Sequence, residues 1–360
     1  MRVLIISTVG LKYEGITSVI LANLRVMDRT GLDIYVAGTI EMNAAICEEI
    51  HELGCKLLKM PNRKNDTLNY FKKLAKFIRT NKIDVVHAHG NSATLAIEMT
   101  AAFLGGCRHR MAHSHNTCCE QIRADKMLRP LFYLFCNEAL ACGEDAGKWL
   151  FRNRPFTVIS NGRDIEQYQF NESMRKKVRD KYGFQSQTVI GHVGGFLPQK
   201  NHEFVLDIFR EVHEIRPEAI LVLVGDGELR EDMEKKAETL GIRENVIFTG
   251  LINNVSELLQ AMDGMLLPSK FEGLPLVAVE WQIAALPCVL SDCITKDCAF
   301  SDLAEFCSLK EPAKKWAERI LHAIDNKDRM VYARQVKMLA REAGFDIKDN
   351  AKMLRNMYLR

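Results

Sequence analysis

The stretch PSKFEGLPLVAVEWQIAALP, from Pro268 to Pro287, joins a predicted strand to a predicted helix. It follows the apolar run Gly264–Leu267, which is typical of a buried parallel strand. Gly273 lets the backbone approach a ligand closely. If a helix begins just after this glycine, the N–H groups of Gly273, Leu274 and Leu276 lie at its positive end and form a ready anion site.

Two carboxylates, Glu272 and Glu280, belong to this stretch and have seven residues between them. Glu272 lies in the loop, where an ordinary solvent-facing role is open to it. Glu280 lies on a helix whose other residues are almost all apolar. Because a buried, unpaired carboxylate costs several kcal/mol, Glu280 needs a hydrogen-bonding partner. We favour a ligand hydroxyl over a structural partner.

Length and composition indicate a two-domain globular protein without a nucleic-acid partner. The chain has 360 residues, and its net charge of +3 is too small to indicate nucleic-acid binding. Its 11 cysteines are scattered without metal-like spacing, which favours free thiols in a reducing cytosol. The start, MRVLIIS, is predicted to be a first strand rather than a signal peptide. We expect a cytoplasmic protein that can contact a membrane from the cytoplasmic face.

Alternating strand and helix patterns predict an α/β protein with two Rossmann-like, doubly wound parallel sheets facing a cleft. Strands are predicted at residues 2–7, 32–38, 55–59, 84–87, 108–113 and 156–159, then at 188–193, 220–224, 246–249, 265–267 and 288–291. The expected organisation is an N-terminal domain over 1–165, a connector over 166–187 and a C-terminal domain over 188–340. The C-terminal helix, 341–360, can pack back on the first domain.

Ligands bind at the carboxyl ends of strands in such sheets, so the loops there are candidate sites. The loop after residues 2–7 contains Gly10 and Gly15, but Ile16 stands where a P-loop needs lysine, and the loop lacks G-x-G-x-x-G. We therefore reject nucleotide binding for this half, while Gly15 can still shape a substrate cleft. In the second half, Gly194 and Gly195 precede Lys200 at a helix entrance, a combination that suits phosphate.

Four histidines follow or end strands in the first half: His87, His89, His113 and His115. The alternating spacing places both members of each pair on one side of an extended chain. Metal binding is an alternative, but no acidic ligand lies nearby, and a structural role is the commoner one. His115 is best placed for chemistry, because it lies furthest past its strand in a polar loop. We expect no metal or other cofactor.

The segment from Leu68 to Ile83 is a basic amphipathic helix. A solvated outer helix and docking on anionic lipid headgroups are equally good interpretations, because Tyr70 and Phe77 are its only candidate aromatic anchors. A second basic and apolar segment follows, with Arg123, Lys126 and Arg129 ahead of the run LFYLF.

Five segments, VISNGRD, GHVGGFLPQKNHEF, LVGDGELRE, NVIFTGL and LPSKFEGLPLVAVE, together resemble the retaining glycosyltransferases of family 4, which have the GT-B fold. The resemblance spans nearly the whole chain and is greatest to members that build bacterial capsular or exopolysaccharide. Each segment is short, and the specificity comes from their order and spacing.

The resemblance implies roles for the residues of the opening stretch. Glu280 would accept hydrogen bonds from the ribose of a nucleotide-sugar, and Glu272 would face the donor sugar. The N–H groups of Gly273, Leu274 and Leu276 would contact sugar hydroxyls and the distal phosphate. The C-terminal domain would thus bind the donor and the N-terminal domain the acceptor.

The resemblance implies further roles outside that stretch. Lys200 would neutralise the diphosphate in the loop of Gly194 and Gly195, and Ile252 and Asn253 would flank the base. Gly15 would lie near the phosphates or the acceptor, and His115 would lie near the reacting centre. The family usually has arginine where Gly195 stands, so one bidentate phosphate partner is missing.

The implied activity is a retaining transfer of a hexosyl or N-acetylhexosaminyl group from a nucleotide-sugar to a growing polysaccharide. We favour uridine over guanosine as the base, and a lipid-linked oligosaccharide as the acceptor. No D-x-D triplet occurs in the sequence, so we expect a metal-independent enzyme. A GT-B nucleotide-sugar epimerase and a non-catalytic nucleotide-sugar-binding partner subunit are the alternatives.

Overall fold

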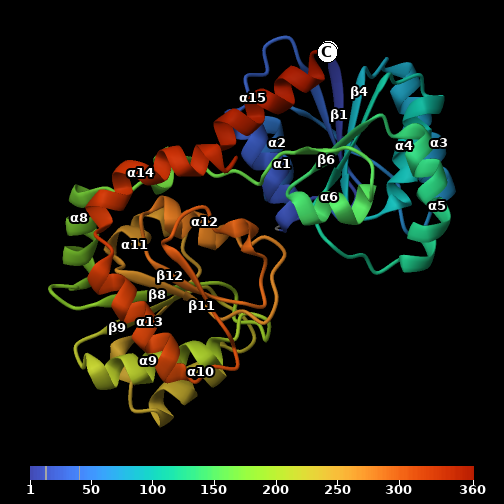
Figure 1. The fold of residues 1–360 in the computed structure, drawn as a ribbon. Coiled ribbons are helices and arrows are strands. Elements are labelled where there is room, and N and C mark those ends of the chain that lie inside the picture. The colour runs from blue at the N-terminus through green and yellow to red at the C-terminus, as the bar shows by residue number, and fades with distance from the viewer. Residues whose placement is uncertain (13, 40) are drawn as a thin grey trace. The chain divides into compact units, whose positions relative to one another are not determined.

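The computed structural model describes residues 1–12, 14–39 and 41–360, and the chain forms two compact units. Unit 1 comprises Met1–Gly162 and Gly344–Arg360, and unit 2 comprises Arg163–Ala343 (Figure 1). The segment 166–187, expected as a connector, forms two helices of unit 2. None of the described helices is long and apolar enough to cross a bilayer.

Unit 1 is built on a seven-stranded parallel sheet in the order β3-β2-β1-β4-β5-β6-β7. Its strands are β1 (Arg2–Ser7), β2 (Asp33–Gly38), β3 (Lys56–Lys59), β4 (Val85–Gly90), β5 (His109–Ser114), β6 (Glu138–Ala141) and β7 (Thr157–Val158). Its helices are α1 (Gly15–Val26), α2 (Ala44–Glu52), α3 (Thr67–Thr80), η1 (Ala93–Leu95), α4 (Ala96–Leu104), α5 (Ile122–Phe135), α6 (Glu144–Phe151) and α15 (Ile347–Tyr358).

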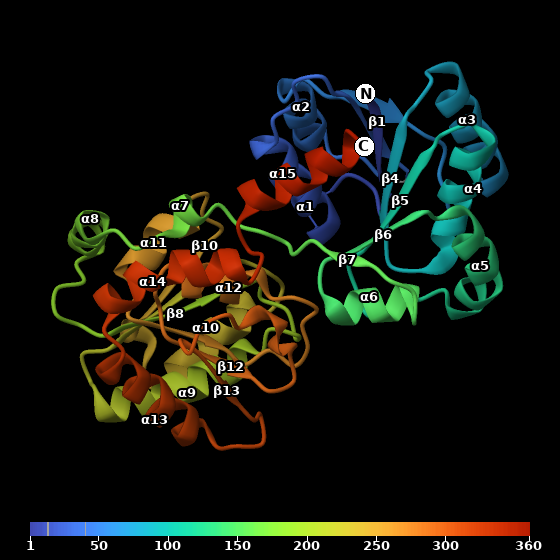
Figure 2. The same ribbon diagram turned by 45° about the horizontal axis from the view of Figure 1, so that its top comes forward.

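Helices cover both faces of this sheet (Figure 2). Because successive side chains of a strand point to opposite faces, Val3 and Ile5 enter the core under α1, α2 and α15. Leu4 and Ile6 enter the opposite core under α3, α4 and α5. The continuous apolar strands of the sequence therefore reflect a sheet that is buried on both sides.

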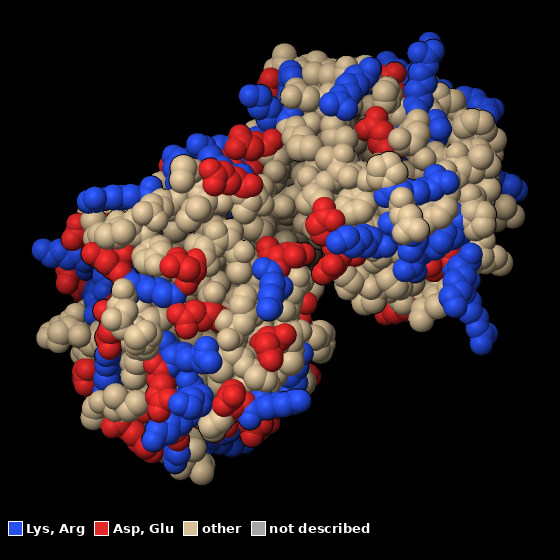
Figure 3. All heavy atoms as spheres, viewed as in Figure 1, with Lys and Arg blue, Asp and Glu red and all other residues tan. Residues whose placement is uncertain are grey.

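The charges are distributed differently over the two units. Figure 3 shows Lys and Arg side chains mixed with Asp and Glu over the visible face of unit 2. The side of unit 1 that carries α3, α4 and α5 shows mainly Lys and Arg.

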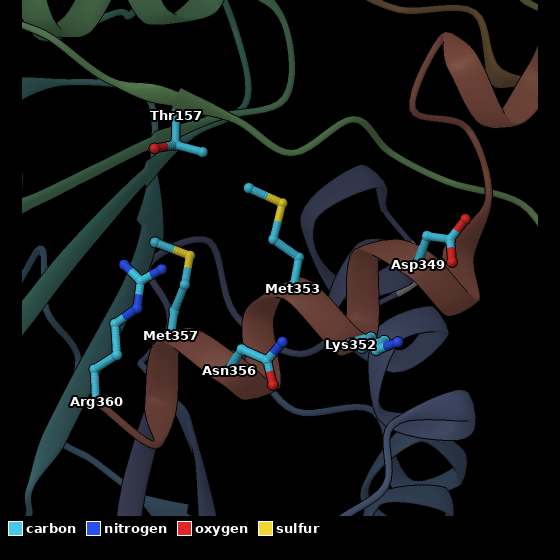
Figure 4. Close-up of a pocket in the computed structure, with 7 residues that line it drawn as sticks. All are labelled: Thr157, Asp349, Lys352, Met353, Asn356, Met357 and Arg360. Carbon is cyan, nitrogen blue, oxygen red and sulfur yellow. The ribbon is translucent and has the colours of Figure 1, made fainter.

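The C-terminal helix α15 completes the core of unit 1. Leu354, Met357 and Tyr358 are buried in the cluster that contains Val3, and the Tyr358 hydroxyl lies 2.7 Å from Nδ1 of His87. Between α15 and Thr157 of β7 lies an open pocket of about 280 Å³, toward which the side chains of Met353 and Met357 project (Figure 4).

Unit 2 is built on a six-stranded parallel sheet in the order β10-β9-β8-β11-β12-β13. Its strands are β8 (Val189–Val193), β9 (Ile220–Val224), β10 (Val246–Gly250), β11 (Gly264–Leu267), β12 (Cys288–Ser291) and β13 (Ala304–Cys307). Its helices are α7 (Ile165–Tyr168), α8 (Glu172–Tyr182), α9 (His202–Ile215), α10 (Arg230–Thr239), η2 (Arg243–Asn245), α11 (Val255–Ala261), α12 (Leu276–Ile283), η3 (Lys296–Cys298), α13 (Ala313–Asn326) and α14 (Arg329–Glu342).

Both sheets reverse their strand order at one point, between β1 and β4 in unit 1 and between β8 and β11 in unit 2. Loops diverge at such a switch point, which opens a crevice at the carboxyl ends of the strands. The α/β prediction with two parallel sheets is confirmed. Two short strands, β6 and β13, were not predicted, because the segments Glu138–Ala141 and Ala304–Cys307 are only four residues long and poor in β-branched residues.

Candidate active site

The switch point of unit 2 brings Lys200 and Glu272 together. Lys200 follows β8 and Glu272 follows β11, and these two strands are neighbours. Nζ of Lys200 lies 2.6 Å from Oε1 of Glu272, and the two side chains are 18% and 10% exposed. The Gln199 amide donates to the other carboxylate oxygen at 3.2 Å. Two residues that are 72 positions apart in sequence thus form one partly buried ion pair.

The helix start beside this pair has the form that the sequence predicted. Helix α12 begins at Leu276, with Pro275 as the preceding residue. In the described part of the chain, the N–H groups of Gly273, Leu274 and Leu276 have no hydrogen-bond acceptor. A Cβ on Gly273 would meet nothing within 4 Å, so packing within the unit does not require glycine there. These donors can therefore bind an anion that approaches the positive end of the helix.

Glu280 has partners within unit 2. Its Oε1 accepts from Nε of Arg163 at 2.6 Å, and Tyr168 also hydrogen-bonds its carboxylate. Burial raises the pKa of Glu280, although Arg163 and Tyr168 oppose that shift. Glu280 thus has the hydrogen-bonding partners that its burial calls for, and the chain supplies them, whereas we had favoured a ligand hydroxyl over a structural partner. A carboxylate has about four lone-pair sites, so it retains capacity for a ligand.

Arg163 and Tyr168 are site residues that sequence reasoning missed. The segment NGRD, which contains Arg163, was singled out only as part of the family resemblance. The available signal was Glu280 itself, because a buried carboxylate needs a partner and arginine is well suited to buried ion pairs. Arg163 is the first residue of unit 2, so nothing local to α12 identifies it.

Gly194 and Gly195 lie at a tight crossing of two loops. Gly225 has a φ of +137°, and a Cβ there would lie 2.1 Å from the carbonyl oxygen of Gly194, so that turn needs glycine. At Gly195 a Cβ would lie 3.6 Å from the carbonyl oxygen of Asp226, an ordinary contact. Local packing therefore does not exclude a larger side chain at Gly195. Ile252 and Asn253 follow β10, at the same edge of the sheet.

In unit 1, the loops after β1, β4 and β5 line a pocket of about 450 Å³. Its lining includes the polar residues Thr8, Asn91, Ser92 and Asn116 alongside apolar ones such as Val9 and Leu95. Gly15 is the first residue of α1, and a Cβ there would meet nothing within 4 Å. The pocket offers hydroxyl and amide groups of the kind that bind sugars.

His115 lies against other imidazoles beside this pocket. Its backbone N–H donates to Oδ1 of Asn91 at 3.3 Å, and Asn91 lines the pocket. Its Nε2 lies 2.8 Å from Nδ1 of His89, and its Nδ1 is buried without a partner in the described chain. Burial lowers the pKa of His115 to about 3, so the ring is neutral at pH 7.

The four histidines form one cluster, in which His87, His89 and His113 are buried and His115 is partly buried. Nε2 of His87 lies 3.2 Å from Nδ1 of His113, and these two rings are inclined by only 8°. Nitrogens of His87, His89 and His113 lie within 4.8 Å of one another, so this set could hold a transition-metal ion. The short contact between His87 and His113 fits a shared hydrogen bond as well as it fits metal ligation, so we assign no metal here.

Unit 1 should lose stability as the pH falls below neutrality. Burial, with repulsion from the other rings, lowers the pKa of His87 to about 3 and those of His89 and His113 well below 6.5. Between about pH 6.5 and pH 3 the histidines of the unfolded chain therefore bind protons, whereas those of the folded cluster do not. Each such proton lowers the free energy of unfolding by about 1.4 kcal/mol per pH unit.

Hydrogen exchange of β4 and β5 peptides at pH 7.5 and 5.5, corrected for intrinsic rates, measures this loss. His89→Asn should show a smaller decrease than the parent chain, whereas His51→Gln, at an exposed position in α2, should keep the parental decrease. An unchanged decrease in His89→Asn would contradict the assignment.

Comparison with known proteins agrees with this architecture. Residues 174–337 match the family described as glycosyl transferases group 1, and residues 13–167 match the one described as glycosyltransferase family 4. The chain is 30% identical over 365 residues to the putative glycosyltransferase EpsF of Bacillus subtilis, which covers 97% of this chain and 94% of that protein.

Two more similarities extend this result. An Escherichia coli enzyme named UDP-Gal:alpha-D-GlcNAc-diphosphoundecaprenol alpha-1,3-galactosyltransferase is 28% identical over 246 residues, 62% of each chain. The crystal structure of Anabaena HepE in complex with UDP has a TM-score of 0.82 and 17% identity over 99% of both chains, which shows a shared GT-B fold. As the motifs predicted, the chain belongs to glycosyltransferase family 4, the group 1 glycosyltransferases.

Proposed function

We propose that the protein transfers a sugar from a UDP-sugar to a growing, lipid-linked polysaccharide, with retention of configuration and without a metal ion. The observation that carries the proposal is the placement of Lys200 and Glu272 at the open N-terminus of α12. The UDP bound by HepE and the lipid diphosphate in the name of the E. coli relative support the choice of donor and acceptor.

The proposed site acts mainly on the leaving group. In the transfer, the bond between C1 of the sugar and the diphosphate oxygen breaks, and the acceptor oxygen bonds to C1 on the same face. The proton of the acceptor hydroxyl passes to the departing phosphate oxygen. Stabilising the charge on that oxygen supplies the largest catalytic effect, through Lys200 and the N–H groups of Gly273 and Leu274.

The ion pair in the free enzyme is compatible with this role. An ammonium group has three donors, and Glu272 uses one of those on Lys200. The remaining donors can contact the diphosphate, while Glu272 accepts from hydroxyls of the donor sugar. Because Gly195 provides no guanidinium, Lys200 is the principal phosphate cation that we assign.

We propose that unit 1 binds the acceptor in the polar pocket after β1, β4 and β5. His115 is neutral at pH 7, so it cannot serve as a protonated acid there. Its proposed role is to position the side chain of Asn91, which lines the pocket, through its backbone N–H. Gly15, at the start of α1, leaves space for a ligand in the same unit.

A non-catalytic, nucleotide-sugar-binding role is the second candidate. Two observations favour it: Lys200 is already neutralised by Glu272, and position 195 carries no cation although a Cβ there would make only ordinary contacts. Such a protein would bind a UDP-sugar and transfer nothing. Transfer assays with purified protein therefore separate the two candidates directly.

Removing either member of the ion pair should abolish most activity without unfolding unit 2. We expect Lys200→Ala and Glu272→Ala to reduce kcat/KM for transfer at least ~100-fold, the scale of losing one key charge stabiliser. Lys270→Ala, which removes an exposed lysine in the same loop, is the matched control and should remain active. Near-parental turnover by either pair variant would contradict the roles assigned.

Substitutions of Glu280 and Arg163 should distinguish the effect of their ion pair on stability from the effect of Glu280 on ligand binding. Glu280→Gln and Arg163→Gln both break the same buried pair, and each should cost roughly 3–5 kcal/mol of stability. Only Glu280→Gln also removes a charged acceptor for ribose, so its Kd for UDP should rise about tenfold more than that of Arg163→Gln. Calorimetric titration measures both constants. Equal losses of UDP affinity would limit Glu280 to a structural role.

Transfer should persist when divalent ions are removed. The helix end and Lys200 are assigned the charge stabilisation that a metal supplies in other enzymes. Activity in excess EDTA should match activity in added Mg²⁺ within twofold, as a product-release assay would measure. Restoration of a lost activity by Mn²⁺ or Mg²⁺ alone would overturn the metal-free mechanism.

A further inference from the structure

Helix α5 of unit 1 presents an apolar face to solvent. Met127 and Leu134 are 73% and 69% exposed, and Ile122 is 55% exposed. Together with Leu131, which is also exposed, Met127 and Leu134 recur at spacings of four and three residues and so lie on one side of the helix. Isolated exposed apolar residues need no explanation, but a contiguous group of them marks an interaction site.

The rest of the solvent-facing side of α5 is basic. Arg123 and Lys126 are its exposed charged residues. The single acid of the helix, Asp125, is buried and paired with Arg129 at 2.6 Å. The exposed side of α5 therefore combines large apolar side chains with positive charge and carries no carboxylate.

The apolar surface continues onto the end of α4. Phe103 and Leu104 are exposed there, and the rings of Phe103 and Phe135 of α5 lie 4.7 Å apart. Arg79 of α3 donates to the carbonyl oxygen of Leu104 at 2.7 Å, which joins the third helix to this surface. The docking surface is thus the exposed side of α5, the end of α4 and the adjoining edge of α3.

Helix α3 contributes positive charge to this surface rather than exposed apolar side chains. Its exposed cations are Lys72, Lys73, Lys76 and Arg79. Tyr70, one of the two aromatics on which membrane docking by α3 depended, is fully buried. Leu68 is its only strongly exposed large apolar residue within the described chain. The apolar component therefore comes from the neighbouring helices.

We propose that unit 1 docks on an anionic lipid bilayer through this surface, with Met127, Leu131 and Leu134 inserted at the headgroup boundary. The charge of the surface indicates an anionic bilayer as its partner, because exposed cations flank the apolar side chains, as on helices that lie in an anionic membrane interface. Docking deepens the proposed transfer to a lipid-linked acceptor but is tested without it.

Vesicle flotation tests the proposal on the full chain. Vesicles of phosphatidylcholine with 30% phosphatidylglycerol are compared with pure phosphatidylcholine, at low and high salt. The parent chain should float with anionic vesicles only, and high salt should weaken its binding. Met127→Glu/Leu134→Glu should reduce the bound fraction at least tenfold. Ile215→Glu/Met338→Glu, which adds the same charges at exposed apolar positions in unit 2, should bind as the parent does.

Further measurements separate the remaining outcomes. Arg123→Gln/Lys126→Gln should bind anionic vesicles several-fold more weakly while retaining its circular dichroism spectrum. Transfer to a water-soluble acceptor should be unchanged in Met127→Glu/Leu134→Glu, so failed docking and failed transfer are distinguishable. Docking is refuted if the parent chain ignores anionic vesicles, or if Met127→Glu/Leu134→Glu floats normally. The surface would instead bind a second copy of the chain if the parent chain were a dimer that does not bind vesicles and Met127→Glu/Leu134→Glu were a monomer.

Discussion

The ion pair between Lys200 and Glu272 is the interaction on which the proposed chemistry depends. It exists because β8 and β11 are adjacent across the switch point of the unit 2 sheet, so the loops that follow them converge. In the free protein the two charges neutralise each other beside a helix end where the N–H groups of Gly273, Leu274 and Leu276 have no acceptor among the described residues. We propose that a diphosphate supplies the negative charge that this arrangement lacks and leaves Glu272 available to sugar hydroxyls.

The buried pair of Arg163 and Glu280 has a different physical function. It joins the first residue of unit 2 to the middle of α12, and Tyr168 adds a third contact. The desolvation cost of burying two ions is offset only when they form good hydrogen bonds, and the 2.6 Å contact between Arg163 and Glu280 is one such bond. The pair therefore holds in place the helix whose N-terminus forms the proposed anion site.

Sequence reasoning predicted the parts of the molecule that local patterns specify. Apolar strands such as Arg2–Ser7 and the start of α12 at Leu276 were located to within a few residues, because both carry strong periodic and boundary signals. The strand Glu138–Ala141 was missed, because its four residues have little intrinsic preference for a strand. They form one here because they pair with β5. Family membership followed from the order of several weak motifs.

Partners that are distant in sequence could not be predicted in the same way. Arg163 lies 117 positions from Glu280, and no periodic pattern connects them. The polar loop expected around His115 gave no sign that its ring would lie 2.8 Å from His89. Likewise, the amphipathic pattern of α3 did not reveal that Tyr70 would be fully buried, or that α4 and α5 would present the larger apolar surface.

A crystal structure of the protein with UDP bound tests the central claim most directly. The account predicts the distal phosphate within hydrogen-bond distance of Lys200 Nζ and of the N–H groups of Gly273 and Leu274, with the ribose hydroxyls at Glu280. A nucleotide bound elsewhere, with the ion pair of Lys200 and Glu272 undisturbed and the α12 N–H groups still without an acceptor, would contradict it.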